Sequence, residues 1–184
     1  PSTGLWMVRG WTRCYFGSLS DQPVPADYDG DGSVDIGCFR ESASLWMVRG
    51  VTQFHFNVDF TPTPQPTIPG PTPEPTPEGE RKLYPVPGDY NGDGTAEAGY
   101  WRSSTGFWSI RGITRVSFGQ SGYVPVQSDY DGDGTLDIAY HRPATGLWAV
   151  RGITRAYFGA FSDTPVPGYY DGDGTAEIAI FRPA

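Results

Sequence analysis

The chain has 184 residues, and its 21 acidic and 13 basic side chains give a formal net charge of −8. This excludes the cationic face that nucleic acids and anionic membrane surfaces require. Its 25 glycines, 18 prolines and 15% aromatic residues exclude a fold of long helices and indicate short strands joined by tight turns, an all-β protein. No apolar run of about 20 residues occurs, so we expect no membrane insertion.

A unit of 40 residues repeats along the chain. The tryptophan of a GLW-like tripeptide marks each copy, at Trp6, Trp46, Trp108 and Trp148, with spacings of 40, 62 and 40. An acidic loop marks each copy as well, with spacings of 62, 40 and 40. One interval therefore holds 22 residues that do not belong to the unit.

In chain order, residues 1–60 contain two predicted strands and then a whole four-stranded unit. Residues 61–80, TPTPQPTIPGPTPEPTPEGE, are a Pro- and Thr-rich linker that cannot form a sheet ladder. As polyproline II, with about 3.1 Å per residue, this linker would reach roughly 60 Å. Residues 81–184 contain two more whole units and two final strands.

Each whole unit has four short apolar or alternating runs, such as YVPVQSDY, LDIAYHRP, GLWAVRG and ITRAYFG within residues 123–159. Four antiparallel strands in tandem copies are typical of β-propeller blades. The closing FRPA would continue into the opening PSTGLW, as HRPATGLW does at residues 141–148. We therefore expect sixteen strands in a four-bladed β-propeller, closed by N- and C-terminal half-blades within one chain or between chains.

Four acidic loops carry 14 of the 21 acidic residues and have oxygen donors at positions 1, 3, 5, 7 and 9. Such a series, with a glycine at position 6 for the sharp turn, wraps a hard cation, and calcium tolerates the irregular oxygen cage best. Position 7 would contribute its backbone carbonyl. The candidate ligands of about four Ca²⁺ ions are Asp27, Asp29, Asp31, Ser33, Asp35, Asp89, Asn91, Asp93, Thr95, Glu97, Asp129, Asp131, Asp133, Thr135, Asp137, Asp171, Asp173, Thr175 and Glu177.

Two other interpretations of these loops can be weighed. An EF-hand needs a glutamate at position 12, where this chain has Cys38, Tyr100, Tyr140 and Ile180. A metal-free Asp-Gly turn is the remaining alternative, although four copies of the donor pattern favour a cation. In the fourth loop Tyr169 replaces the first aspartate, so we expect the weakest calcium affinity there.

The loop pattern DxDxDGxxD, followed by an apolar strand and FRPxTGxW, resembles bacterial FG-GAP or VCBS-type repeats, which are related to the calcium-binding blades of the integrin α-subunit propeller. The resemblance covers everything except the linker. It implies a propeller with calcium in the hairpin between the first and second strands of each blade. It also implies an extracellular or cell-surface protein.

No catalytic constellation is visible, and we expect no enzyme. His55 and His141 fall at unlike positions of the unit and have no recurring nucleophile beside them. Cys14 and Cys38 are too few for a disulfide scaffold, so burial as small apolar residues is expected. Whether they are bonded to one another is left open.

The leading hypothesis is a calcium-stabilised structural module that binds copies of itself. The long linker would let residues 1–60 complete a propeller with residues 81–184 of another chain, and such exchange can build a filament or tube, or close two chains into an eight-bladed ring. The alternative is an adhesive or lectin-like propeller that binds a glycan or a surface protein. Trp11 and Trp101, which break the repeat pattern, are its candidate contacts, unless they only pack.

Overall fold

The computed structural model describes residues 3–56 and 82–183, so the predicted linker at residues 61–80 lies outside the described residues. Sixteen strands form in these ranges, the number predicted, and all of them pair in antiparallel fashion. The strands are β1 (Thr3–Val8), β2 (Thr12–Ser18), β3 (Gln22–Pro23), β4 (Gly37–Arg40), β5 (Leu45–Val48), β6 (Thr52–His55), β7 (Leu83–Pro85), β8 (Gly99–Arg102), β9 (Phe107–Ile110), β10 (Thr114–Ser117), β11 (Val124–Pro125), β12 (Ala139–Arg142), β13 (Leu147–Val150), β14 (Thr154–Tyr157), β15 (Thr164–Pro165) and β16 (Ile180–Phe181), and a 3-10 turn, η1 (Glu41–Ala43), follows β4. No helix of the described ranges is long and apolar enough to cross a membrane.

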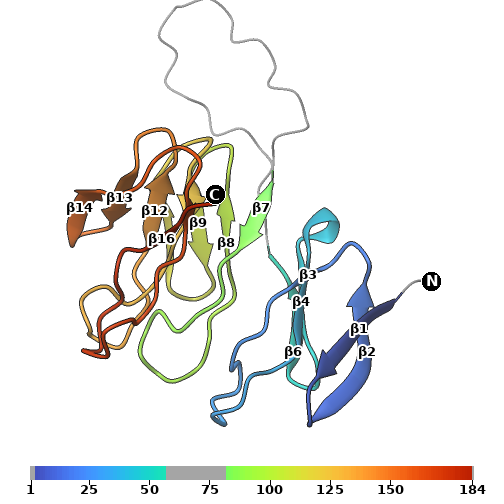
Figure 1. The fold of residues 1–184 in the computed structure, drawn as a ribbon. Coiled ribbons are helices and arrows are strands. Elements are labelled where there is room, and N and C mark those ends of the chain that lie inside the picture. Colours follow the sequence, from blue (N-terminus) through green and yellow to red (C-terminus); the bar gives the residue numbers. More distant parts are fainter. Residues whose placement is uncertain (1–2, 57–81, 184) are drawn as a thin grey trace, which may run out of the picture.

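The described strands form three four-stranded sheets and two hairpins. We name them sheet 1 (β3–β6), sheet 2 (β7–β10), sheet 3 (β11–β14), the N-terminal hairpin (β1–β2) and the C-terminal hairpin (β15–β16). Each strand of a sheet lies beside its neighbour in the sequence. Figure 1 shows the N-terminal hairpin at one side of the molecule and sheet 3 at the other, with the acidic loops at the lower end.

The three sheets share one register. The second and third strands of each sheet pair Phe39 with Trp46, Trp101 with Trp108, and His141 with Trp148. The side chains at these positions are all fully buried. A large ring pair therefore occupies the same place in every sheet.

The first strand of each sheet is shorter than predicted. The predicted run at residues 123–130 yields only β11, followed by one isolated bridge between Ser128 and Asp137. Pro125 has no N–H group to donate, so one backbone hydrogen bond between the two strands cannot form. The chain then leaves the sheet to enter the acidic loop.

Consecutive sheets are held together by shared apolar cores. Tyr100 and Leu83 of sheet 2 pack with Trp46 of sheet 1, and Ile138 of sheet 3 packs with Trp108 of sheet 2. The C-terminal hairpin lies on sheet 3 in the same way, through Ile178 and Ile180. Each sheet thus depends on the next to cover its apolar face.

The array of sheets is not closed by hydrogen bonds within the described ranges. There β1 pairs only with β2, and β16 only with β15, so each end of the array is a two-stranded hairpin. Large apolar side chains of both hairpins are exposed, among them Val8 and Phe181. The described chain is an all-β array with two open ends.

Candidate metal sites in the acidic loops

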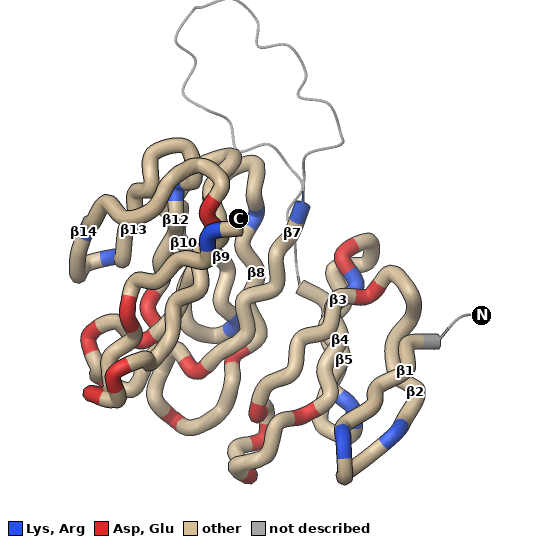
Figure 2. Tube along the Cα trace, in the orientation of Figure 1, with Lys and Arg blue, Asp and Glu red and all other residues tan. Residues whose placement is uncertain are grey.

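The four acidic loops, numbered loop 1 to loop 4 in chain order, are residues 27–35, 89–97, 129–137 and 169–177. They connect the first and second strands of the three sheets and of the C-terminal hairpin. Figure 2 shows that most Asp and Glu residues gather on them, at the lower end of the molecule. In loop 1 the Asp27 carboxylate accepts hydrogen bonds from the amides of Gly30, at 2.7 Å, and Gly32, at 2.9 Å. Gly32 has a φ of +84°, which glycine adopts without strain. Asp89 and Asp129 close loops 2 and 3 in the same way.

A second set of bonds anchors the far end of each loop. Asp35, at position 9, accepts from the amide of Tyr28 at 2.9 Å, and the Tyr28 hydroxyl donates to the Val24 carbonyl at 2.8 Å. The other loops repeat this pattern through Tyr90 with Glu97, Tyr130 with Asp137, and Tyr170 with Glu177. Burial raises the pKa of Tyr28, so its hydroxyl stays a donor.

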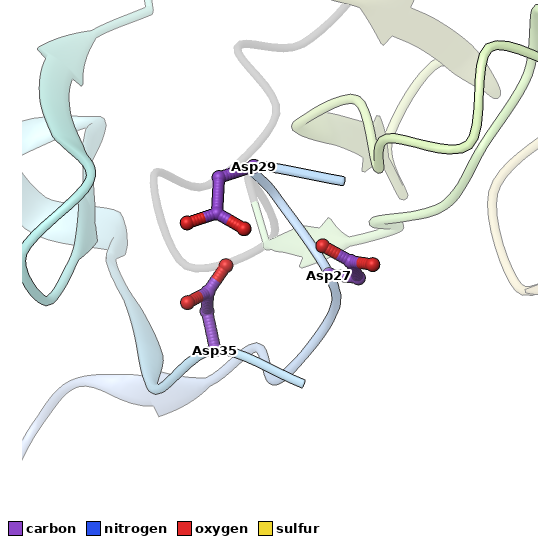
Figure 3. A group of neighbouring side chains, drawn as sticks. All are labelled: Asp27, Asp29 and Asp35. Carbon is purple, nitrogen blue, oxygen red and sulfur yellow. The ribbon is translucent and has the colours of Figure 1, made fainter. Parts of the chain in front are cut away.

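Three of the loops bring carboxylates together. In loop 1, oxygens of Asp27, Asp29 and Asp35 all lie within 4.8 Å of one another, and Figure 3 shows the three side chains turned toward a common space. Loop 3 brings together the same positions, 1, 3 and 9, as Asp129, Asp131 and Asp137, whereas loop 4 brings together positions 3, 5 and 9, as Asp171, Asp173 and Glu177. These donors are all oxygens, the ligands that hard cations prefer, so each group could hold a metal ion.

Among the described residues, the ion pairs join Asp21 to Arg40 and Asp163 to Arg182, and neither pair includes a carboxylate of these clusters. Burial, and after it the carboxylates of Asp131, Asp129 and Asp133, raise the pKa of Asp137. Burial likewise raises the pKa of Glu97 in loop 2. A bound cation would relieve this repulsion, because it favours the ionised carboxylates.

The residues at positions 5 and 7 of each loop are hydrogen-bonded to one another, through the carboxylate at position 5 and the amide or hydroxyl group at position 7. Asp93 accepts from both the amide and the hydroxyl of Thr95, and Asp133, Asp173 and Asp31 accept from Thr135, Thr175 and Ser33. The threonine bonds hold the pKa of Asp93, Asp133 and Asp173 below the usual range. Asp31 and Asp133 do not belong to the clusters of loops 1 and 3.

Loops 2 and 4 each differ from this arrangement. In loop 2 the Asn91 side-chain amide donates to Asp93 at 3.1 Å and to Glu97 at 2.9 Å, so a donor group lies between the carboxylates. In loop 4 Tyr169 stands where the other loops have an aspartate that accepts from two glycine amides. Its side chain is exposed. Each of these loops therefore has one carboxylate fewer than loops 1 and 3.

Consecutive loops are also joined by backbone hydrogen bonds, which sequence reasoning did not predict. The amide of Ala96, at position 8 of loop 2, donates to the Asp27 carbonyl of loop 1 at 2.6 Å. Leu136 donates to Asp89 at 2.8 Å, and Ala176 donates to Asp129 at 2.7 Å. No side-chain signal could have revealed these bonds, because backbone groups make them. We call them loop links.

The structure also places the two tryptophans, two histidines and two cysteines that the sequence analysis considered. Trp101 is fully buried, so of its two predicted uses only packing is compatible with the structure, whereas Trp11 is 69% exposed. His141 is also fully buried, with its ring 4.9 Å from that of Trp148. His55 is exposed, and its Nδ1 lies 3.0 Å from the Ala43 carbonyl oxygen. Within the described ranges, both cysteines are free thiols.

Comparison with known proteins does not place this chain in a family: no protein-family model, no curated protein and no solved structure matches it.

Proposed function

We propose that the chain is a non-enzymatic, calcium-stabilised structural module of the cell exterior that assembles with copies of itself. The observation that carries this proposal is the contrast between the inside and the ends of the array. Val8, in the N-terminal hairpin, is 41% exposed, whereas Val48, at the same position of sheet 1, is 3% exposed. Chains rarely leave such apolar edges uncovered.

Calcium as the stabilising ion is supported by the donor sets and the charges. All donors are carboxylate, amide or carbonyl oxygens in glycine-containing loops with exposed tips, where six to eight ligands can be completed by water. Four dications would neutralise the net charge of −8. Such water-accessible loops are expected to bind calcium weakly. Calcium modules outside the cell have Kd values of about 10⁻⁴–10⁻³ M, so an extracellular location fits these loops.

The proposed architecture is that of a four-bladed β-propeller, in which the C-terminal hairpin of one copy and the N-terminal hairpin of another combine into the fourth blade. Each hairpin has the strand register of the corresponding half of a sheet: Trp6 pairs with Cys14 as Trp46 pairs with Phe54, and Pro165 pairs with Ile180 as Pro125 pairs with Tyr140. Together, the two hairpins therefore have the strand register of one four-stranded sheet. Blade exchange across the linker is a second route by which copies could join.

Thermal unfolding in calcium, in magnesium and in a chelator tests the first part of the proposal. At a free calcium concentration 100 times Kd, each site adds about 2.7 kcal/mol to the free energy of unfolding. We expect calcium to raise Tm well above its value in chelator, and magnesium to do so far less. Equal Tm values in the three conditions would overturn the calcium proposal.

Light scattering of the intact chain and of a chain lacking residues 61–80 tests the second part. The deletion still leaves a connection longer than the direct one from Ser117 to Val124, so sheets 1 and 2 can keep their contact. Assembly of the intact chain alone would assign the joint to blade exchange across the linker. Assembly of both would assign it to the open ends, and monomers in both cases would refute self-assembly.

A further inference from the structure

We infer that copies join end to end at one defined joint, in which β16 of one copy pairs with β1 of the next. This inference rests on the proposed self-assembly and names its interface. The two hairpins then form one four-stranded sheet, in the order β15, β16, β1 and β2. The pairing follows from sheet 1, where Phe39 faces Trp46 and Cys38 faces Met47. At the joint, Phe181 faces Trp6 and Ile180 faces Met7.

The N-terminal end presents a groove of the right chemistry. Most of its lining is apolar, from the N-terminal hairpin (Trp6, Val8 and Trp11) and from sheet 1 with its acidic loop (Pro25, Val34 and Ile36), and Ser33 and Asp35 of that loop complete it. The corresponding tryptophan of sheet 1, Trp46, is fully buried because Phe39 and Tyr28 pack on it, with ring centroids at 5.4 and 6.3 Å. Trp6 lacks these two partners within its own hairpin.

The C-terminal end presents the missing partners. Phe181 and Tyr170 stand at the positions of Phe39 and Tyr28, and both are exposed. Phe181 is 61% exposed, while Phe39 is completely buried. One end therefore carries a groove and the other end carries the two rings that fill the same place inside every sheet.

The loop links predict a further contact across this joint. Inside the array, the amide at position 8 of one loop donates to the carbonyl at position 1 of the preceding loop. The end residues at these positions are Val34 in loop 1 and Tyr169 in loop 4, and both are exposed. At the joint the Val34 amide of one copy donates to the Tyr169 carbonyl of the other.

A second copy, and not the chain's own C-terminal hairpin, is the occupant that we assign. Within the described ranges β16 pairs only with β15 and packs on sheet 3 through Ile180, and Figure 1 shows sheet 1 between the N-terminal hairpin and the other sheets. Asp163, in the connection from β14 of sheet 3 to β15, ties down the end of β16: its buried carboxylate binds Arg182, the residue after β16, through two hydrogen bonds of 2.7 Å, and accepts another from the amide of Ala160. Asp21 and Arg40 fix the N-terminal hairpin to sheet 1 with the same geometry. The two hairpins are therefore held in place in each single copy, before the copies join.

Cross-linking of two separate variants tests this joint. Both variants carry Cys14→Ala and Cys38→Ala, and one adds Met7→Cys while the other adds Ile180→Cys. When the two are mixed in calcium and treated with a short bis-maleimide, we expect a covalent dimer. Met7→Cys mixed with Tyr157→Cys is the matched control, because Tyr157 is as exposed as Met7 but lies on β14. The control mixture should give far less dimer than the test mixture.

The outcomes separate the joint from the proposed assembly. Light scattering that shows polymers, together with no Met7–Ile180 product, would overturn the joint and leave self-assembly standing. A monomer whose Met7→Cys/Ile180→Cys double variant cross-links within one chain would overturn both, in favour of a self-closed ring. Equal dimer yields in the test and control mixtures would also overturn the joint, because the cross-link would then be unspecific.

Discussion

The contacts inside the array and the two ends of the array use equivalent positions of the repeating unit. Inside the array a neighbouring sheet or hairpin buries the side chains at these positions, and at the ends they are exposed. A buried tryptophan, an aromatic partner and a loop link recur at both contacts between sheets and again where the C-terminal hairpin packs on sheet 3. At the ends, equivalent positions carry exposed Val8, Phe181 and Tyr170. The repeat therefore specifies an interface that every unit needs and that the outermost halves lack. We therefore expect substitutions inside the array to lower the free energy of unfolding strongly. Substitutions at the ends should lower it only when copies are assembled.

The largest expected difference concerns the repeated tryptophan. Trp108 is fully buried, and its indole N–H donates to the Phe118 carbonyl at 2.9 Å. Trp108→Ala should lower the free energy of unfolding by about 3–5 kcal/mol. Trp6→Ala in dilute, unassembled protein should cost less than half of that, because Trp6 borders an open groove. Urea unfolding at low protein concentration measures both, and equal losses would contradict the comparison.

The acidic loops give a second contrast, between the loops with four carboxylates and those with three. Asp129→Ala in loop 3 should remove one calcium site and about 2.7 kcal/mol of calcium-dependent stability at 100 times Kd. Tyr169→Asp and Asn91→Asp, which restore the missing carboxylates, should instead strengthen binding in loops 4 and 2. Calorimetric titration with calcium gives the number and affinity of sites. No gain in either restored loop would show that the carboxylate count does not set the affinity.

A smaller effect is expected from the ion pairs that hold the end hairpins. Arg182 lowers the pKa of Asp163 to about 2 through their hydrogen bonds, so the folded state favours the ionised carboxylate. This stability is present above the ordinary pKa near 4 and is lost as the pH falls toward 2. Asp163→Asn should lower Tm at neutral pH and flatten the acid decline. Arg142, at the inner equivalent of Arg182, lies over the ring of Tyr123 instead, at 5.7 Å, so Arg142→Gln should leave that decline unchanged.

The smallest expected effect comes from His141, where sheet 1 has Phe39. Burial lowers the pKa of His141, although Asp163 opposes the shift. The neutral ring therefore stabilises the fold above the ordinary pKa of about 6.5, and that stability is lost as the pH falls below it. His141→Phe should keep Tm at pH 5 closer to its value at pH 7 than the unaltered chain does. An identical pH dependence in both proteins would show that His141 does not titrate on unfolding.

The sequence predicts the strand count, the antiparallel pairing and the places of the acidic loops, because these follow from local patterns repeated at fixed spacing. It does not predict the loop links, since backbone amides and carbonyls make them, nor the short first strand imposed by residues such as Pro125. The burial of Trp101 depends on its pairing with Trp108, which only register reveals. The open ends are likewise invisible to local patterns, because Phe181 and Phe39 occupy the same place in the unit.

Self-assembly through the open ends is tested most directly by the mass of the protein in calcium. Light scattering over a range of concentrations gives this mass for the unaltered chain and for Phe181→Asp. Phe181 is exposed in the single chain, so this variant should fold with an unchanged Tm when dilute. We expect the unaltered chain to grow in mass with concentration, while Phe181→Asp stays at the mass of one chain. Equal masses for the two proteins at every concentration would contradict self-assembly through the open ends.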